Sequence, residues 1–298
     1  MSSLRPFFKG IVDYAGLFPP AKLDMSSAVH AYARYRAGHD ADLLGRFVLP
    51  ASRLEEFSAV ASALLPHEGE PWKLSVIGSD DLDQTKTLIE HFNGAHETRS
   101  TGGHAVCDTI EIPVHSHDDI RNAVAVFGDD TSLFLEVSSL AEPAYLISAI
   151  GDTSASAKIR TGGITDSAFP AAEQVLRFIE SCVDNGVPFK ATAGLHHAIR
   201  GSYPLTYDDG AHRATMFGFL NIFFAAAFCA AGSSESAVLA VIEETDPSMF
   251  HHDSEGLWWD DHVVTHEQLS VVRQAVAVSF GSCSFTEPVE EARTLHLI

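Results

Sequence analysis

The sequence predicts an α/β fold, a single (β/α)8 TIM-barrel-like domain with a helical C-terminal elaboration. Three observations support this expectation. Short β-rich runs alternate with helical patterns at fairly even spacing, close to the period of a βα unit. No G-x-G-x-x-G follows the first expected strand and no P-loop occurs, which disfavours an open doubly wound sheet. The 298 residues, 46% of them apolar, suffice to bury one large core.

Seven runs rich in β-branched, aliphatic or aromatic residues are expected to be strands. They cover residues 7–13, 46–49, 73–77, 109–114, 132–137, 156–160 and 188–193. The eighth strand of a barrel has two candidates, near residues 216–221 or near 275–280. The sequence leaves this choice open.

Helical patterns fill the segments between these strands. Asp24 can cap a helix that ends near Gly38. The patterns Ser52–Glu55 and Ser139–Glu142 are typical of capping boxes just after the second and fifth strands. Further helices are expected at 81–92, 117–127 and 170–183. Each helix therefore follows a strand after a short loop.

The repeat fades after residue 193, and no interdomain linker is visible, so residues 1–298 are expected to form one domain. We place the barrel at about 5–232 and the extension at about 233–298. The uncharged stretch 214–234 is interrupted by glycine and asparagine and predicts a buried core helix rather than a membrane span. Beyond it we expect a helix at 233–242, a His- and Trp-rich loop, and a helix opened by Thr265 and Gln268.

Composition limits the partners. Nineteen Lys and Arg against 40 Asp and Glu give a formal charge of −21, which disfavours nucleic acid and anionic membrane surfaces. The four cysteines form no C-x-x-C pair and are expected to be free thiols. The first residues lack the apolar run of a secretory signal, so a cytoplasmic location is expected. The aromatic run 217–228 is typical of core or of a subunit interface, which leaves a homo-oligomer open.

Charged residues inside expected strands are the main functional signal. They are Glu111, Glu136, Lys158, Arg160 and Lys190. Barrel strands are buried on both faces, so such a charge is costly unless it is paired or lies at the active-site end. Side chains two apart share a face, which places Lys158 with Arg160. By the same rule Lys190, Thr192 and His196 share a face if the strand runs that far.

Two of only six lysines, Lys158 and Lys190, fall mid-strand in consecutive βα units. Burial and neighbouring positive charge both favour the neutral form of a lysine. A neutral amine can attack a carbonyl carbon and form a Schiff base. The pair therefore predicts a lyase that needs no metal or other cofactor.

The runs Lys158-Ile-Arg-Thr-Gly-Gly and Lys190-Ala-Thr-Ala-Gly resemble the strand-six and strand-seven signatures of class I aldolases of the deoxyribose-phosphate aldolase type. Upstream, residues 109–114 and 133–137 are similar to two further strands of that family, so the resemblance covers roughly residues 105–195. It implies that Lys158 forms the imine and that Lys190 is the neighbouring cation favouring its neutral amine. It also implies that Glu111 relays protons and that Glu136 is a supporting carboxylate.

Departures from the family pattern affect the expected substrate. Arg160 stands where the family has a small residue, and a guanidinium there could bind a carboxylate or phosphate. His196 and His197 replace small residues that help to bind phosphate in the family. We therefore expect a small oxo or anionic substrate, without deciding whether it is phosphorylated. The expected substrate contacts are Arg160, Glu136, Gly162, Gly163, Thr192, His196, His197, Asp13 and Tyr14.

Three other interpretations stay open. A metal-dependent barrel hydrolase or isomerase would use His115, His117, His196 and His197 with Glu136. A non-catalytic protein that binds organic anions would use Lys158, Arg160 and Lys190 as a fixed positive cluster. A purely structural network would pair the two lysines with Glu111 and Glu136.

Overall fold

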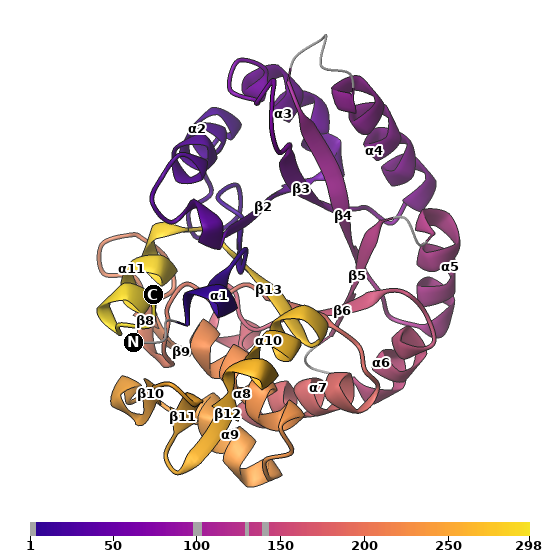
Figure 1. The fold of residues 1–298 in the computed structure, drawn as a ribbon. Helices are drawn as coiled ribbons and strands as arrows, with labels where there is room; N and C mark the ends of the chain where they lie inside the picture. The colour runs from indigo at the N-terminus through magenta and orange to yellow at the C-terminus, as the bar shows by residue number, and fades with distance from the viewer. Residues whose placement is uncertain (1–3, 98–102, 129–130, 139–142) are drawn as a thin grey trace.

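Eight parallel strands close into a barrel in the computed structural model, which describes residues 4–97, 103–128, 131–138 and 143–298 (Figure 1). Around the barrel the order is β1-β13-β7-β6-β5-β4-β3-β2. The strands are β1 Val12–Tyr14, β2 Leu44–Pro50, β3 Trp72–Ile77, β4 Ala105–Pro113, β5 Ser132–Val137, β6 Ser156–Arg160, β7 Phe189–Thr192 and β13 Ala277–Ser282. The predicted (β/α)8 barrel is confirmed, and six of its strands lie close to where the sequence predicts them.

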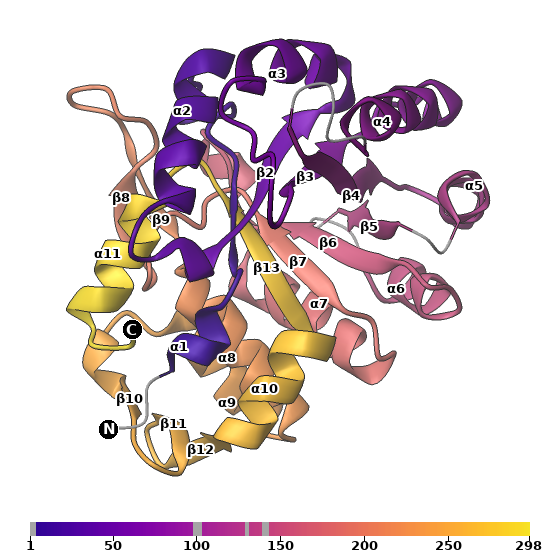
Figure 2. The ribbon, with the colours of Figure 1, turned by 45° about the horizontal axis from the view of Figure 1, so that its top comes forward.

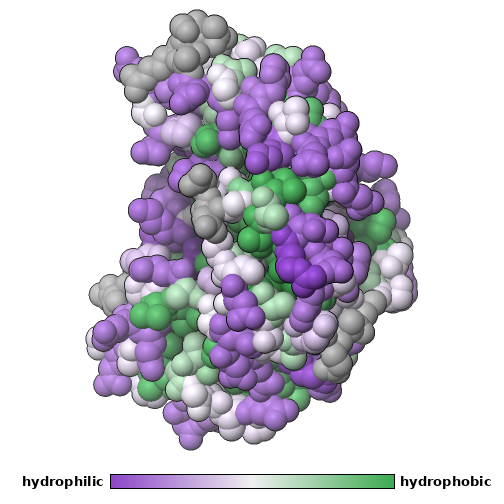
Figure 3. Space-filling view, turned by 90° about the vertical axis from the view of Figure 1, so that its right-hand side faces the viewer, coloured by the Kyte–Doolittle hydropathy of each residue, from purple (hydrophilic) through white to green (hydrophobic). Residues whose placement is uncertain are grey.

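Helices alternate with the strands and form the outer ring that Figure 1 shows. They are α2 Met25–Arg36, α3 Leu54–Ala61, α4 Leu82–Glu97, α5 His117–Phe127, α6 Ala144–Gly151, α7 Ala172–Asp184, α8 Phe219–Ala230 and α11 Thr286–Thr294. Short 3-10 turns lie at Ala41–Leu43, Ala51–Arg53, Asp166–Ala168 and Pro247–Met249. The face over α5 and α6 is mainly hydrophilic, with smaller hydrophobic areas (Figure 3).

The structure shows some of the predicted helix caps but not all of them. The side chain of Asp24 accepts a hydrogen bond from the backbone N–H of Ser27 at 2.8 Å, as predicted. The expected capping box at Ser52 is wrong, because the chain first makes a 3-10 turn and α3 begins only at Leu54, without a side-chain cap. The Ser139–Glu142 pattern lies outside the described residues.

The first strand differs from its prediction. Residues Arg5–Phe8 form the short helix α1, with a proline in its first turn, and β1 begins only at Val12. The rings of Phe7 and Phe8 pack against aromatic side chains of α8, at centroid distances from 5.9 to 6.5 Å. The apolar run at residues 7–8 is therefore a hydrophobic contact with α8, not part of the barrel wall.

The eighth strand is β13, which pairs with both β1 and β7. The expected barrel limit at residue 232 is therefore wrong, because residues 277–282 close the barrel from within the segment assigned to the extension. The other candidate, 216–221, ends the short strand β9 (Arg213–Met216) and begins α8. Phe280 of β13 stacks on Phe219 of α8 at 4.7 Å between ring centroids, so this helix covers the closing strand.

The C-terminal elaboration contains α9 Glu235–Glu243, α10 His266–Ala275 and a small sheet of β10 Phe250–His252, β11 Gly256–Trp259 and β12 His262–Thr265. It is therefore not purely helical. Thr265 and Gln268 form the predicted capping box of α10. In Figure 2 the small sheet lies beside α9 and α10, whereas the hairpin of β8 (Gly201–Pro204) and β9 lies near α11.

The uncharged stretch forms the buried helix that the sequence predicts. Every residue of α8 from Phe219 to Phe228 is buried. Among the described residues no helix has both the length and the apolar character that a membrane span requires.

Candidate active site in the barrel lumen

Five charged side chains form one continuous chain of ion pairs inside the barrel. In order they are Asp13, Lys190, Glu111, Lys158 and Glu136. Lys190 Nζ lies 2.7 Å from Asp13 Oδ2 and 2.7 Å from Glu111 Oε1. Lys158 Nζ lies 2.5 Å from Glu111 Oε2 and 2.7 Å from Glu136 Oε2. The two lysines therefore share one carboxylate.

Strand register explains this arrangement. Lys158 pairs with Lys190 across β6 and β7, and with Glu136 across β5 and β6. Side chains at paired positions of neighbouring strands point to the same face, which here is the lumen. Glu111 reaches both lysines from β4, and Asp13 completes the chain from β1.

Two buried hydroxyl groups fix the carboxylates. Ser75 Oγ donates to Glu111 Oε1 at 2.6 Å, and Ser279 Oγ donates to Asp13 Oδ2 at 2.8 Å. The second oxygen of Asp13 accepts the backbone N–H of Arg46 at 2.7 Å. Both oxygens of Asp13 and of Glu111 are thus engaged, which offsets the cost of burying these carboxylates.

Burial and charge act in opposite directions on these groups. Burial alone would raise the pKa of Glu111, but the two adjacent ammonium groups outweigh it and hold that pKa well below its usual range. For Lys190, burial would lower the pKa, but Asp13 and Glu111 outweigh it and raise the pKa. The ring of Phe134 also lies 5.5 Å from Lys190 Nζ. Lys190 is therefore a permanent cation and Glu111 a permanent anion at neutral pH.

A cavity of about 170 Å³ opens above this network, at the carboxyl ends of the strands. Its floor includes Glu111, Lys158 and Lys190, and its polar wall includes Arg160, Thr192 and His196. The remaining wall is small or apolar: Ala15, Phe18, Pro19, Pro20, Val48, Ile77, Gly163, Ile164, Ala193, Gly194, Gly281 and Cys283. Active sites of (β/α)8 barrels lie at this end. The volume is below the roughly 300–1,000 Å³ of pockets for drug-sized ligands, so it suits a small molecule.

Arg160 differs from the lysines. It is exposed, it is the last residue of β6 on the face of Lys158, and it lines the cavity. Within the described ranges it makes no ion pair, whereas Lys158 and Lys190 each contact two carboxylates. Its guanidinium is the lining cation that remains available to a ligand.

His196 lines the cavity near the end of β13, next to a cysteine. Its Nδ1 lies 3.2 Å from Ser282 Oγ and 3.5 Å from Cys283 Sγ. Burial, together with His197, lowers the pKa of His196 to about 4, and burial raises the pKa of Cys283 to about 11. At neutral pH this is a neutral imidazole beside a neutral thiol, not a thiolate nucleophile.

Five of the predicted substrate contacts do not line the cavity, and three of these five pack elsewhere. Tyr14 alternates with Asp13 on β1 and points outward, where its ring packs against Tyr32 and Tyr35 of α2. His197 turns toward Glu291, with Nδ1 2.7 Å from its Oε1. Gly162 packs against Phe169 and Gly194, where a Cβ would meet the phenyl ring at 2.4 Å. His197 therefore ties the loop after β7 to α11, and Gly162 makes a contact between loops.

Asp13 and Glu136 belong to the site in another way. Asp13 lies under the cavity and contacts Lys190, not the lumen opening. Glu136 contacts Lys158 and keeps 22% of its side chain exposed, whereas the side chains of Asp13, Glu111 and the two lysines are at most 4% exposed. Its carboxylate therefore links the buried network to solvent.

The four histidines proposed as metal ligands are not brought together. His117 stacks on Tyr145 at 3.8 Å and hydrogen-bonds its backbone carbonyl, while His197 pairs with Glu291. His115 is exposed at the start of the loop after β4. Across residues 4–97, 103–128, 131–138 and 143–298, no group of three or more His, Cys, Asp or Glu side chains could hold a metal ion.

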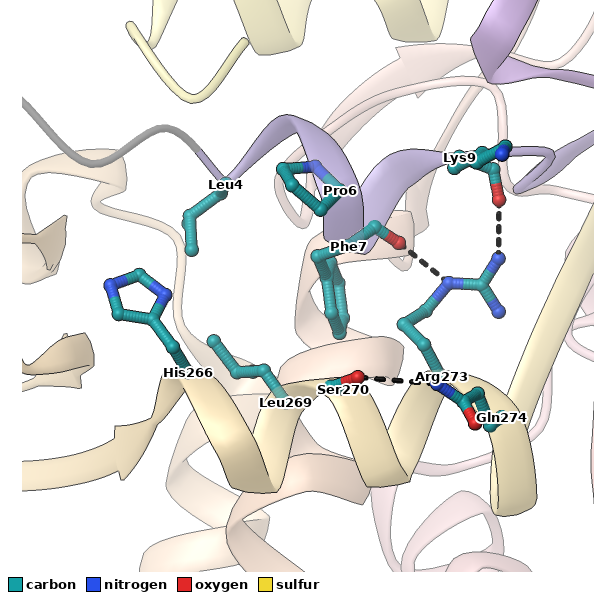
Figure 4. A pocket seen from close by; sticks show the side chains of 9 residues that line it. All are labelled: Leu4, Pro6, Phe7, Lys9, His266, Leu269, Ser270, Arg273 and Gln274. Atoms are coloured by element: carbon teal, nitrogen blue, oxygen red, sulfur yellow. Dashed lines mark hydrogen bonds between the residues drawn. The ribbon is translucent and has the colours of Figure 1, made fainter.

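A larger cavity, of about 500 Å³, lies at the amino ends of the strands, between α1 and α10 (Figure 4). There Arg273 donates to the backbone carbonyls of Phe7, Lys9, Ala277 and Val278 at 2.5–2.9 Å. Burial lowers the pKa of this guanidinium to about 10. Its bonds tie the segment before β1 to the start of β13, so its role is to hold the closing strands together.

The sequence reasoning missed Ser75, Ser279 and the pairing of His196 with Cys283. Each serine interrupts an apolar run of a strand, at a position whose side chain faces the lumen. Because alternate residues of a strand face the same side, the sequence pattern could have identified both. The contact between His196 and Cys283 joins residues 87 positions apart, and no local pattern signals it.

Comparison with protein-family models and with curated proteins finds no match to this chain.

Proposed function

We propose that this protein is a lyase that forms a Schiff base between Lys158 and a small oxo compound, and that makes or breaks a carbon–carbon bond beside the resulting iminium. One observation carries the proposal: Lys158 reaches the floor of a small cavity at the carboxyl end of the barrel, with two carboxylates touching its Nζ. Groups that can exchange its proton are therefore in place.

The charges of the site suit this chemistry. An ammonium group and a carbonyl give an iminium and one water, so a single positive charge stays at the same place throughout. The carboxylates of Glu111 and Glu136 that stabilise the ammonium of Lys158 also stabilise the iminium. The iminium then accepts the electron pair of the bond between its α and β carbons and becomes an enamine. The hydroxyl on the β-carbon gives its proton to an adjacent carboxylate, and the β-carbon leaves as the carbonyl carbon of the second product. Bond formation is the reverse.

Glu136 is the better proton acceptor of the two. Attack requires a neutral amine, so one proton must leave Lys158 before the carbon–nitrogen bond forms. Both oxygens of Glu111 already accept strong hydrogen bonds, and Lys190 keeps it ionised. Glu136 engages Lys158 through one oxygen and is partly exposed. It takes the proton and returns it to the carbinolamine hydroxyl, which leaves as water.

Glu111 and Lys190 position Lys158 in this proposal. Glu111 directs the Nζ of Lys158 toward the cavity, and Lys190 neutralises Glu111 from below. This revises the proton relay that the family resemblance implies for Glu111. The purely anion-binding alternative is less favoured, since both lysines are already paired with carboxylates.

Borohydride trapping tests the proposal. The protein is incubated with small aldehydes, ketones and 2-oxo acids, reduced, and analysed by intact mass and peptide mapping. We expect a stable adduct on Lys158 and none on the other five lysines. The wild-type peptide map identifies the lysine without any variant. Lys158→Ala should lose the adduct, whereas Lys86→Ala, at a half-buried position of α4 outside the barrel lumen, should keep it.

Absence of any Lys158 adduct, in protein shown to be folded by circular dichroism, would refute the proposal. An adduct spread evenly over surface lysines would refute it as well, because that pattern reports only nonspecific amine reactivity.

A further inference from the structure

We infer that the substrate is a small oxo acid carrying one carboxylate, bound by Arg160 at the cavity mouth, and not a phosphorylated compound. This inference rests on the proposed function and names the substrate class of the same site. It departs from the family resemblance, which would suggest a phosphate ester.

Most basic side chains of the cavity are not available to an incoming anion. Besides histidine, the residues lining the cavity include three basic side chains, those of Lys158, Arg160 and Lys190. Each lysine already contacts two carboxylates at 2.5–2.7 Å. His196, the remaining basic group in the wall, is neutral above about pH 5, because burial keeps its pKa near 4. One guanidinium is thus left for an incoming anion.

The charge of Arg160 matches that of a single carboxylate. A guanidinium binds one carboxylate through two parallel hydrogen bonds, and the charges cancel. A phosphate monoester carries about −1.5 to −2 charges at neutral pH and would leave part of that charge uncompensated. The network below already holds three carboxylates against two ammonium groups, so it repels extra negative charge.

The remaining wall of the cavity is largely apolar. Near the mouth it consists of Phe18, Pro19, Pro20 and Ile164, which offer no side-chain donor to phosphate oxygens. The cavity of about 170 Å³ fits a short carbon chain against these side chains. Apolar walls with few polar groups are typical of sites for small organic molecules.

The strand geometry sets the orientation. Arg160 follows Lys158 by two residues on one face of β6, which places its Cα about 7 Å nearer the strand end. The carbonyl carbon therefore reaches Lys158 at the floor, while the carboxylate points toward the opening. Arg160 also holds the substrate during imine formation, so its contribution appears in binding.

The test compares three carbonyl compounds in the trapping reaction. Pyruvate carries a carboxylate, methyl pyruvate has the same carbon skeleton without the charge, and dihydroxyacetone phosphate carries a phosphate. Each is trapped on wild type, Arg160→Met and Arg34→Met. Arg34 is an exposed arginine on α2 and gives a matched control for loss of one surface charge.

We expect Arg160→Met to lower the rate of Lys158 adduct formation with pyruvate by about 10- to 100-fold, the effect of losing a charge-assisted hydrogen-bonded pair. With methyl pyruvate the rate should change by less than about threefold, and Arg34→Met should change neither. Equal losses with both compounds, or faster trapping of dihydroxyacetone phosphate than of pyruvate, would overturn the inference and leave the imine chemistry standing.

A second measurement separates the two proposals. Oxamate resembles pyruvate but forms no imine, so it reports the carboxylate site alone. It should raise the thermal unfolding temperature of wild type and of Arg34→Met, but not of Arg160→Met. Oxamate stabilisation through Arg160 without any Lys158 adduct would refute the lyase and keep the carboxylate site. Adducts without an Arg160-dependent oxamate effect would refute the carboxylate site and keep the lyase.

Discussion

Removing Lys190 should destabilise the fold strongly, because it leaves two buried carboxylates without their shared cation. Lys190→Met keeps an unbranched apolar stem, one atom shorter than lysine, but removes both contacts at 2.7 Å, to Asp13 and to Glu111. All three side chains are at most 3% exposed. Breaking a buried pair by deleting one partner costs about 3–5 kcal/mol. We expect the free energy of unfolding at pH 7 to fall by that amount.

Equilibrium urea unfolding measures this loss through the midpoint and the slope. The loss should shrink at acidic pH. In wild type the pKa of Glu111 is lowered, so its contribution to stability is present above the unfolded-state pKa and is lost as the pH falls through the folded-state pKa. Without Lys190 the carboxylates can take up protons in the folded state. The difference in the free energy of unfolding between wild type and variant should therefore become smaller as the pH falls.

A double-mutant cycle with Asp13→Asn gives the matched control. The amide keeps the acceptor for the Arg46 backbone N–H and removes the charge. The double variant should lose clearly less than the sum of the two single losses. A loss below about 1 kcal/mol for Lys190→Met, or strict additivity in the cycle, would refute the description of the lumen as a tightly coupled charge network.

Three further outcomes are expected. Glu136→Gln should slow adduct formation on Lys158 by about 10²- to 10⁴-fold in single-turnover trapping, the usual effect of general base catalysis, and an unchanged rate would remove Glu136 from the mechanism. The pKa of His196 is lowered to about 4, so as the pH falls the unfolded state binds a proton at this residue before the folded state does. The free energy of unfolding should therefore rise by about 3 kcal/mol between pH 4 and 6.5. His196→Gln should flatten this part of the plot of unfolding free energy against pH, and an unaltered profile would contradict the lowered pKa of His196. Arg273→Met should cost about 2–4 kcal/mol in urea unfolding because several buried carbonyls lose their donors, and Arg273→Lys should restore only part of it; full rescue by lysine would show that charge alone suffices there.

The sequence by itself determined most of the barrel. Period and length identified the strands at 132–137 and 156–160 with the observed limits, since 156–160 alternates polar and apolar residues and 132–137 contains a short continuous apolar run. It failed at residues 7–8, where aromatic side chains suit a strand and a buried helix equally well. Packing against α8 decides between them, and that contact spans more than 200 residues of chain.

The site was predictable as a set of charges but not as a network. Glu111, Lys158 and Lys190 were identified because they are charged residues in strands expected to be buried, and burying an unpaired charge costs free energy. Barrel closure alone decided that Asp13, from the other end of the chain, contacts Lys190 and that Ser279 supports it. Alternation along a strand tells which face a side chain occupies, whereas its partner across the lumen depends on how eight strands are ordered and staggered. That is why the sequence indicated a lysine site, and only the tertiary structure decided which carboxylates neighbour each lysine and that Arg160 pairs with no carboxylate among the described residues.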